Sequence, residues 1–135
     1  MNSPAQLLNE KLKRWDFFGE CIIWGFNSTR FGYGLDLAIN YVWDSNKNVR
    51  NDTLENPLLF VFQLLGVDSI RLSGGLTSGM KADPGIIDWG FAEVARVEAF
   101  ESAAGCGLSV RWEGKRRLEV EFDDYILLSP EGNPL

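Results

Sequence analysis

The amino-acid sequence predicts a mainly β domain of the α+β class: an antiparallel sandwich or partly open barrel of six to eight strands with one short N-terminal helix. The chain has 135 residues, the usual size of one domain. Apolar and polar side chains alternate in short segments after residue 20, and turn-forming residues separate those segments. We therefore expect a single domain over 1–135, with a helix at 4–17, a β-rich body at 20–128 and a mobile tail at 129–135.

The N-terminal segment has the spacing of an amphipathic helix. Residues 3–6 read Ser-Pro-Ala-Gln, which is a capping box with proline at the first helical position. Leu8, Leu12 and Trp15 follow at i, i+4 and i+7, positions that share one face of a helix. Gly19 is expected to end the helix.

Four strands are predicted in the first half of the body. Residues 20–26 and the strictly alternating segment 35–43 form an antiparallel pair joined by a turn-rich connection. The polar stretch 45–56 is expected to be turn and loop. Residues 58–65 are apolar on both faces and bounded by Pro and Gly, which favours a central strand, and 67–72 continue as another short strand.

The second half ends in a hairpin. Residues 73–85 are rich in glycine and are expected to form a loop. Residues 86–101 fit a helix by propensity and a strand by alternation, and the neighbouring strands favour the strand. The alternating segments 106–112 and 118–122 form a hairpin around a tight turn, followed by a strand at 125–128.

Composition excludes several classes of chemistry. The chain has no histidine, which removes Ser-His and Cys-His nucleophiles and the histidine ligand sets of zinc and haem. The 13 basic and 19 acidic residues give a net charge of −6, which argues against a nucleic acid or an anionic membrane as the main partner. We therefore expect no catalytic residue, no metal site and no cofactor.

The cysteines and the N-terminus indicate a cytoplasmic protein. Cys21 and Cys106 lie far apart in the chain and lack metal-ligand spacing, so buried thiols are favoured over a disulfide or a reactive thiol. Residues 1–6 lack the basic and apolar order of a signal peptide. The longest apolar run, 58–62, is too short to span a membrane.

The densest acidic cluster consists of Glu119, Glu121, Asp123 and Asp124. Glu119, Glu121 and Asp123 are spaced by two, so they share one face of a strand whose other face is apolar. Such carboxylates hold a cation or act in acid–base chemistry when they converge in a cleft. The opposite apolar face favours a solvated surface, with Arg111 and Arg117 as cross-strand partners.

Aromatic residues are the second candidate for a functional surface. The chain contains five tryptophans, nine phenylalanines and three tyrosines, more than a small core readily hides. Tyr33, Trp43 and Trp89 lie near predicted loops or strand ends, where amphipathic aromatic residues favour protein interfaces. The predicted interface therefore consists of Tyr33, Trp43, Trp89, Glu119, Glu121 and Asp123.

The order of segments resembles a known class of bacterial proteins. After the helix come 18–24 (Phe-Gly-Glu-Cys-Ile-Ile-Trp), the strand 35–43, the segment 60–74 and the closing 117–122 (Arg-Leu-Glu-Val-Glu-Phe). Over 15–128 this layout resembles small β-rich immunity-type proteins encoded beside polymorphic toxins. The resemblance implies a non-enzymatic protein that binds and blocks a cognate toxin. It carries over no functional residue, because the class shares no catalytic motif.

Three functional hypotheses follow. The first is a non-enzymatic protein-binding module, an immunity-type inhibitor whose acidic surface meets a basic toxin, because opposite potentials speed association; a homodimer is compatible with it. The alternative is a small β-barrel or sandwich that holds an apolar or aromatic ligand in an aromatic-lined pocket. The third is a carboxylate-dependent enzyme, which requires two acids in one cleft with separated pKa values.

Overall fold

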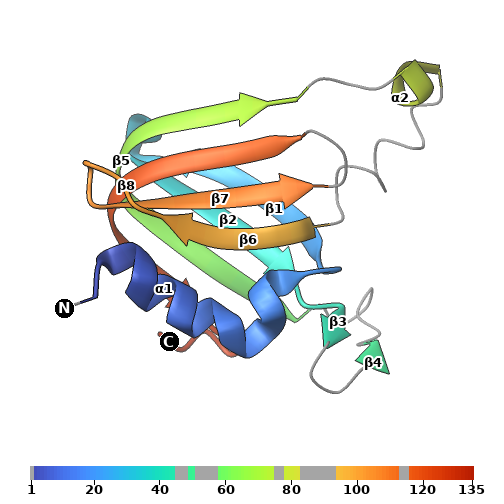
Figure 1. Ribbon diagram of the computed structural model, residues 1–135, viewed down its shortest axis with the longest axis horizontal. Coiled ribbons are helices and arrows are strands. Elements are labelled where there is room, and N and C mark those ends of the chain that lie inside the picture. The colour runs from blue at the N-terminus through green and yellow to red at the C-terminus, as the bar shows by residue number, and fades with distance from the viewer. Residues whose placement is uncertain (1, 45–48, 51–57, 75–77, 83–93, 113–115) are drawn as a thin grey trace.

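A six-stranded antiparallel sheet forms the body of the protein in a computed structural model (Figure 1). The structure describes all residues except 1, 45–48, 51–57, 75–77, 83–93 and 113–115. The strand order is β1-β2-β5-β8-β7-β6, and a separate two-stranded ribbon consists of β3 and β4. The strands are β1 (Ile22–Thr29), β2 (Gly34–Asn40), β3 (Trp43–Asp44), β4 (Val49–Arg50), β5 (Leu59–Ser73), β6 (Val94–Phe100), β7 (Cys106–Trp112) and β8 (Arg117–Leu128). The helical elements are α1 (Pro4–Leu12), the 3-10 turns η1 (Lys13–Phe18) and η2 (Arg30–Gly32), and the short α2 (Ser78–Ala82).

These elements confirm the predicted fold class. The sheet curls around the core, and α1 lies against β6 and β7 on its concave side (Figure 1). Strands β1 and β6 are its two edges, so the described sheet is not closed into a barrel. The predicted C-terminal hairpin is confirmed as the pairing of β7 with β8.

Alternation of side chains explains the core. On β2, Leu35, Leu37 and Ile39 are buried, while the residues between them are half-buried on the other face. Leu8 and Leu12 of α1 are fully buried against this concave face, as their helical spacing predicts. The largest fully buried side chains are Phe18, Phe62, Phe122, Leu8, Leu12, Leu35, Leu37, Ile39, Leu64, Leu108, Leu118 and Leu127.

Strand β5 is longer than the sequence predicts. Two strands, 58–65 and 67–72, are expected on either side of Gly66, but one strand of 15 residues runs through that glycine. Gly66 has φ +63°, a conformation that glycine adopts without steric cost, and a bulge follows between Val67 and Ser69. The strand therefore bends at this point instead of ending.

The N-terminal helix is shorter than predicted. The α-helix ends at Leu12 and not near residue 17, and the 3-10 turn η1 follows it. Asp16, Phe17 and Phe18 have φ values of 49°, 54° and 57°, so three consecutive residues adopt the left-handed conformation. Each such residue costs about 1–2 kcal/mol. Burial of an aromatic side chain offsets part of this cost.

The buried side chain is Phe18, the centre of an aromatic cluster. Its ring centroid lies 5.1 Å from that of Phe60 and 6.0 Å from those of Tyr41 and Phe62. Trp15 stacks on it at 5.8 Å. Each aromatic pair of this kind adds about 0.5–1.5 kcal/mol beyond the burial of area. The cluster fills the concave side of the sheet beneath η1.

Backbone-directed hydrogen bonds cover the edge strand β6. The side-chain amide of Asn9 donates to the Ala99 carbonyl at 3.0 Å and accepts from the Ala99 N–H at 2.8 Å. At the other end, the Glu20 N–H donates to Val94 O at 2.9 Å, and the Val94 N–H donates to Cys21 O at 2.8 Å. These contacts occupy edge groups that would otherwise pair with another chain.

Replacing Asn9 by alanine is expected to lower the free energy of unfolding by about 1–3 kcal/mol, because a part-buried donor and acceptor on Ala99 lose their partners. Chemical denaturation followed by fluorescence measures the change. Glu10→Ala is the matched control, since it removes only an exposed ion pair with Lys13 from the same helix. Equal losses in the two variants would show that Asn9 does not secure the edge.

The remaining boundaries differ locally from the predictions. The strand predicted at 35–43 ends at Asn40, where the side-chain oxygen accepts from Leu58 N–H at 3.2 Å, and Trp43 belongs to β3. The short helix α2 lies within the predicted loop 73–85. In the segment 86–101, the strand prediction is confirmed over β6, and residues 86–93 lie outside the described part.

The C-terminal residues lie against β8. The sequence predicts a mobile tail at 129–135, whereas Leu128 and Pro134 form a β-bridge and Leu135 N–H donates to Leu127 O at 2.8 Å. A turn closed by Ser129 N–H and Asn133 O, at 2.8 Å, reverses the chain. Proline and glycine serve here as turn residues, and the mobility of 129–135 stays a prediction.

Candidate functional site

The structure does not bring the six predicted interface residues together. Tyr33 follows the turn between β1 and β2, while Trp43 lies beyond the opposite end of β2, a strand of seven residues. Since a strand rises about 3.3 Å per residue, roughly 20 Å separates the two aromatic residues. Trp89 lies outside the described residues. The three acidic residues are on β8, where Asp123 lies nearer to Tyr33 than Glu119 does.

The turn between β1 and β2 presents two exposed aromatic side chains. Arg30 and Phe31 of η2 have φ values of 50° and 59°, and Gly32 continues the left-handed run at 94°. This backbone holds the Phe31 side chain fully in solvent, and Tyr33 is 70% exposed. The left-handed conformation strains an L-residue, and the exposed phenyl ring gains no stabilisation from burial.

Acidic residues adjoin this turn through the register of the sheet. The Val67 N–H donates to Tyr33 O at 2.9 Å, which fixes the turn against the bend of β5. Leu65 lies opposite Gly34 on one side and Asp124 on the other. A Cβ atom at Gly66 would lie 2.8 Å from the Asp123 Cβ atom, so the absence of a side chain lets β8 approach closely.

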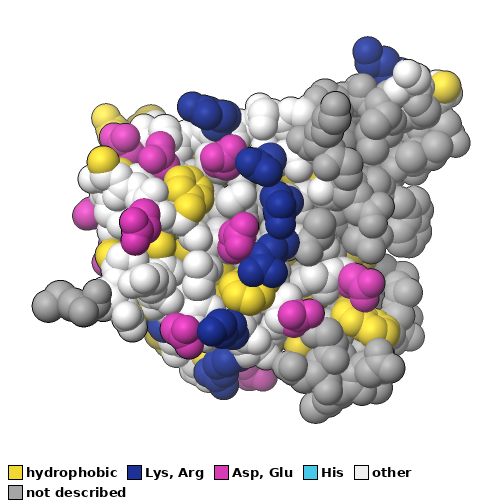
Figure 2. All heavy atoms as spheres, viewed as in Figure 1, with side chains coloured by type: hydrophobic (Ala, Val, Ile, Leu, Met, Phe, Trp, Pro, Cys, Tyr) yellow, Lys and Arg dark blue, Asp and Glu magenta, His cyan; other side chains and the backbone are white. Residues whose placement is uncertain are grey.

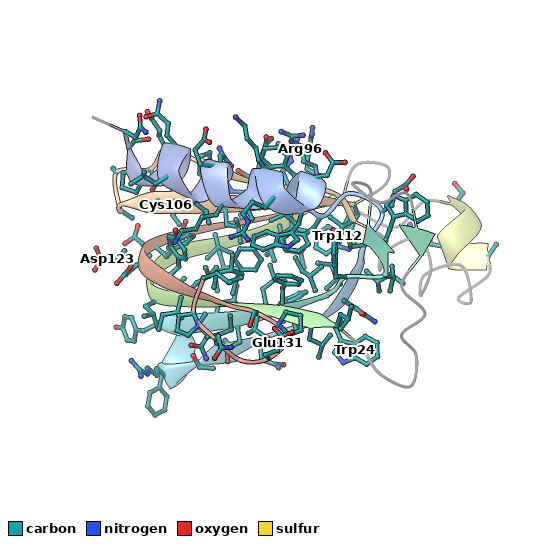
Figure 3. All side chains as sticks on the ribbon, turned by 90° about the horizontal axis from the view of Figure 1, so that it is seen from below. Trp24, Arg96, Cys106, Trp112, Asp123 and Glu131 are labelled. Carbon is teal, nitrogen blue, oxygen red and sulfur yellow. The ribbon has the colours of Figure 1, made fainter. Side chains whose placement is uncertain are left out.

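We call this surface the hairpin end; it consists of Phe31, Tyr33, Asp68, Asp123 and Asp124. All five residues are exposed. Figure 2 shows acidic and hydrophobic side chains mixed at the end of the sheet opposite β3 and β4, and Figure 3 shows Asp123 at that end and Trp24 at the other. One strand, β5, lies between Tyr33 and Asp124, so two strand spacings of about 4.8 Å, roughly 10 Å in total, span the patch.

Glu119 and Glu121 of β8 lie on the convex outer face that β5, β8, β7 and β6 form. Glu119 is opposite Arg71 on β5 and Ser109 on β7. The prediction that Arg111 and Arg117 pair across strands with these acids is wrong, because the register places Arg111 and Arg117 opposite each other. Arg117 instead reaches Glu119 along its own strand, at 3.9 Å.

Two hydroxyl groups hold the carboxylate of Glu121. Ser69 and Ser102 each donate to one of its oxygens at 2.7 Å. These hydrogen bonds lower the pKa of Glu121 below its ordinary range, and the bond from Ser102 has the larger effect. A group with a lowered folded-state pKa stabilises the fold above its unfolded pKa of about 4.3 and loses that contribution as the pH falls through its folded value.

Replacing Ser69 and Ser102 together by alanine is expected to raise the pKa of Glu121 toward its ordinary value, because the ionised carboxylate loses both donors. Carboxyl-carbon NMR titration of the side chain measures the change directly. Ser28→Ala, an exposed serine on β1, serves as the control. An unchanged Glu121 titration in the double variant would contradict this assignment.

Two shallow hollows lie on the outer face, beside the glutamates. One, of about 240 Å³, is lined by Ser69, Arg71, Phe100, Glu119 and Glu121. The other, of about 230 Å³, is lined by Glu98, Ala99, Phe100, Ser109, Arg111, Arg117 and Glu119. Both are smaller than the roughly 300–1,000 Å³ of sites for drug-sized ligands. Within the described ranges, no three cysteine or acidic side chains converge to hold a metal ion.

The cysteines occupy buried positions. Cys21 and Cys106 are both buried, and no disulfide joins them. Burial raises the pKa of the Cys106 thiol, which disfavours the reactive thiolate. The interpretation of both residues as buried thiols is therefore confirmed. Among the helices that the structure describes, none is long and apolar enough to cross a membrane.

Sequence reasoning missed two features of these surfaces. Phe31 is a large apolar residue in a turn flanked by glycine, and its position outside any alternating strand was the available signal. Arg96 belongs to a row of arginines on the outer face. The row forms only because β6 pairs with β7 in a register that depends on a bulge between Val94 and Arg96. No local pattern in the sequence indicates that register.

Comparison with protein families, curated proteins and solved structures finds no match to this chain. The candidate function therefore rests on the residues of the hairpin end and of the outer face. The hairpin end combines exposed aromatic rings with carboxylates, and the outer face combines arginines with glutamates. Both are exposed surfaces suited to binding.

Proposed function

We propose that the chain is a non-enzymatic protein-binding module, an immunity-type inhibitor that docks its hairpin end on a basic protein of the toxin class. The observation that carries this proposal is Phe31, whose side chain is fully exposed on a left-handed backbone. A ring held in water at the expense of backbone strain stabilises nothing within the chain. It has the properties of an anchor that is buried in a partner.

The surroundings of Phe31 match the anatomy of a binding hot spot. Aromatic anchors concentrate binding energy near the centre of an interface, and polar groups surround them. Here Tyr33 adjoins the anchor, and Asp68, Asp123 and Asp124 form the polar surround. The strand bend at Gly66 and the hydrogen bond between Val67 and Tyr33 hold the two parts together.

Charge favours a basic partner. The chain carries a net charge of −6, and the hairpin end contains three aspartates. An acidic surface attracts a basic protein over distances of about a Debye length, roughly 8–10 Å at physiological salt, and raises the association rate. The same charge repels nucleic acid, which supports a protein partner.

The alternative of a small apolar ligand has weaker support. The concave side of the sheet, where such a pocket would lie, is filled by the rings of Trp15, Phe18 and Phe60, with centroid separations of 4.9 Å to 5.8 Å. The two hollows described above lie on the polar outer face instead. Aromatic residues thus pack against one another inside the sheet and are exposed to solvent at the hairpin end.

A carboxylate-dependent enzyme also has weaker support. Glu119 and Glu121 lie on the convex face, and hydrogen bonds lower the pKa of Glu121. A general acid at neutral pH needs the opposite change, a pKa raised by burial or by a neighbouring carboxylate. Binding therefore explains the arrangement of these acids better than acid–base catalysis does.

Co-expression with the proteins encoded beside its gene tests the proposed function. We expect one of them, a basic protein, to form a complex of fixed stoichiometry that survives size-exclusion chromatography, and Phe31→Ala to weaken it. Leu7→Ala is the matched control, because Leu7 is also an exposed apolar side chain but lies on α1. Failure of every neighbour to bind, or equal weakening by both variants, would overturn the proposal.

A further inference from the structure

Three arginines line up across the outer face of the sheet. Arg111 on β7 lies opposite Arg96 on β6 and opposite Arg117 on β8. Neighbouring strands are about 4.8 Å apart, so the three backbone positions span roughly 10 Å. We call this set the arginine row. Figure 2 shows a line of basic side chains crossing this face, with acidic side chains on either side.

Like charges in this register repel each other. Directly opposed charges of one sign destabilise a pair of strands, and Arg111 faces such a neighbour on both sides. Arg96 is neutralised by Glu98 at 2.9 Å, and Arg117 reaches Glu119 at a longer 3.9 Å. Within the described part of the chain, Arg111 makes no ion pair, so positive charge remains at the centre of the row.

The outer member of the row is fixed in place. The Arg96 guanidinium lies over the Phe17 ring, with its central carbon 3.9 Å from the ring centroid, while its Nε donates to Glu98. Because Phe17 covers one face of the Arg96 guanidinium and Glu98 pairs with its Nε, the outer edge of this planar group is available to bind an anion. A guanidinium held this way loses little conformational entropy when it binds an anion.

A hollow of about 230 Å³ adjoins the row and supplies room for a ligand group. Arg111 and Arg117 line one part of it, and Ser109 of β7 lines another. The ring of Phe100 covers Gly107, the next outward-facing position along β7, and forms a further wall. The volume suits a compact group and is below the size of sites for drug-sized ligands.

From this geometry we infer that the arginine row is a binding site for a single oxyanion, a phosphate or a carboxylate, centred on Arg111. Guanidinium groups bind both anions through paired N–H donors, which matches the planar oxygens of a carboxylate and two oxygens of a phosphate. The bound charge would relieve the repulsion within the row. This site is separate from the hairpin end and does not depend on the proposed function.

The glutamates beside the row limit what the site accepts. Glu98 and Glu119 line the same hollow, so an extended polyanion would meet negative charge on the sides of the row. Nucleic acids gain affinity from many phosphate contacts at once, which three arginines between two glutamates do not supply. A single compact anion brings less negative charge near Glu98 and Glu119 than a polyanion does, so the arginine row favours the compact anion.

Titration with inorganic phosphate and, separately, with succinate tests the inference. We expect one or both to shift the NMR signals of the Arg111 amide and guanidinium saturably, with Arg111→Gln weakening that binding at least tenfold. Arg71→Gln is the matched control, because it removes the same charge from the outer face but lies outside the row, opposite Glu119. A response to phosphate alone or succinate alone identifies the chemical class of anion.

Two further variants sharpen the test. Arg111→Gln is expected to unfold at an equal or higher temperature than the parent protein, because it removes repulsion, so loss of binding would not reflect misfolding. Glu98→Gln is expected to strengthen anion binding by releasing Arg96. Absence of saturable binding of both anions, or equal weakening by Arg111→Gln and Arg71→Gln, would overturn the inference.

Discussion

Replacing Phe18 by alanine is expected to lower the free energy of unfolding by about 3–5 kcal/mol. Phe18 is fully buried, and its ring contacts the rings of Trp15, Tyr41, Phe60 and Phe62. The variant loses this packing but keeps the left-handed backbone of η1, which the packing offsets in the parent protein. Since small domains are stable by only about 5–15 kcal/mol, the variant would be close to unfolding at ambient temperature.

Urea denaturation followed by tryptophan fluorescence measures this change, because Trp15 stacks on Phe18 and reports the packing of the cluster. Phe17→Ala is the matched control: Phe17 is the adjacent residue in the same left-handed run but only half-buried. We expect it to lose less than half as much stability. Equal losses would contradict the claim that burial of the Phe18 ring dominates the stability of this segment.

Replacing Phe31 by glycine is expected to weaken binding of the cognate partner by about 2 kcal/mol or more, roughly 30-fold, as for a hot-spot aromatic residue. The same change is expected to leave the free energy of unfolding unchanged or to raise it by up to about 1 kcal/mol. Phe31 has φ +59°, which suits glycine, and its fully exposed ring contributes no burial. Binding would thus weaken without any loss of stability.

Phe31→Ala separates the two effects. It removes the ring but retains a side chain in the left-handed region, so binding should fall as in the glycine variant without any gain in stability. Calorimetric titration and thermal unfolding of both variants measure affinity and stability. A loss of stability of more than about 1 kcal/mol in Phe31→Gly would contradict the exposed, strained conformation of this residue.

The strands were largely predictable because burial on one face produces a period of two. The segment 106–112 and the segment 118–122 alternate clearly, and both form strands. The predicted ends of strands and helices were wrong where the backbone conformation, and not the polarity of the side chains, determines where an element ends. Gly66 bends a strand that it was expected to end, and Asp16 begins a left-handed turn within residues expected to be helical. Positive φ at non-glycine residues has no reliable signature in a single sequence.

The candidate site was predictable only in part. Tyr33 and Asp123 were both predicted as interface residues, but their proximity depends on the pairing of β2 with β5 and of β5 with β8. Trp43 has the same sequence signal as Tyr33 and lies at the opposite end of β2. The arginine row requires a register set by a bulge in β6. Long-range register therefore determines which of the charged and aromatic residues share a surface.

Hydrogen–deuterium exchange of the chain with and without its basic partner is the most direct test of the hairpin end as the docking surface. We expect the partner to slow exchange in peptides that cover residues 30–34, 65–68 and 122–124, which meet at this end of the sheet. Peptides from α1 should be unaffected. Protection confined to α1 or to the arginine row, with unchanged exchange at 30–34, would contradict the proposed docking surface.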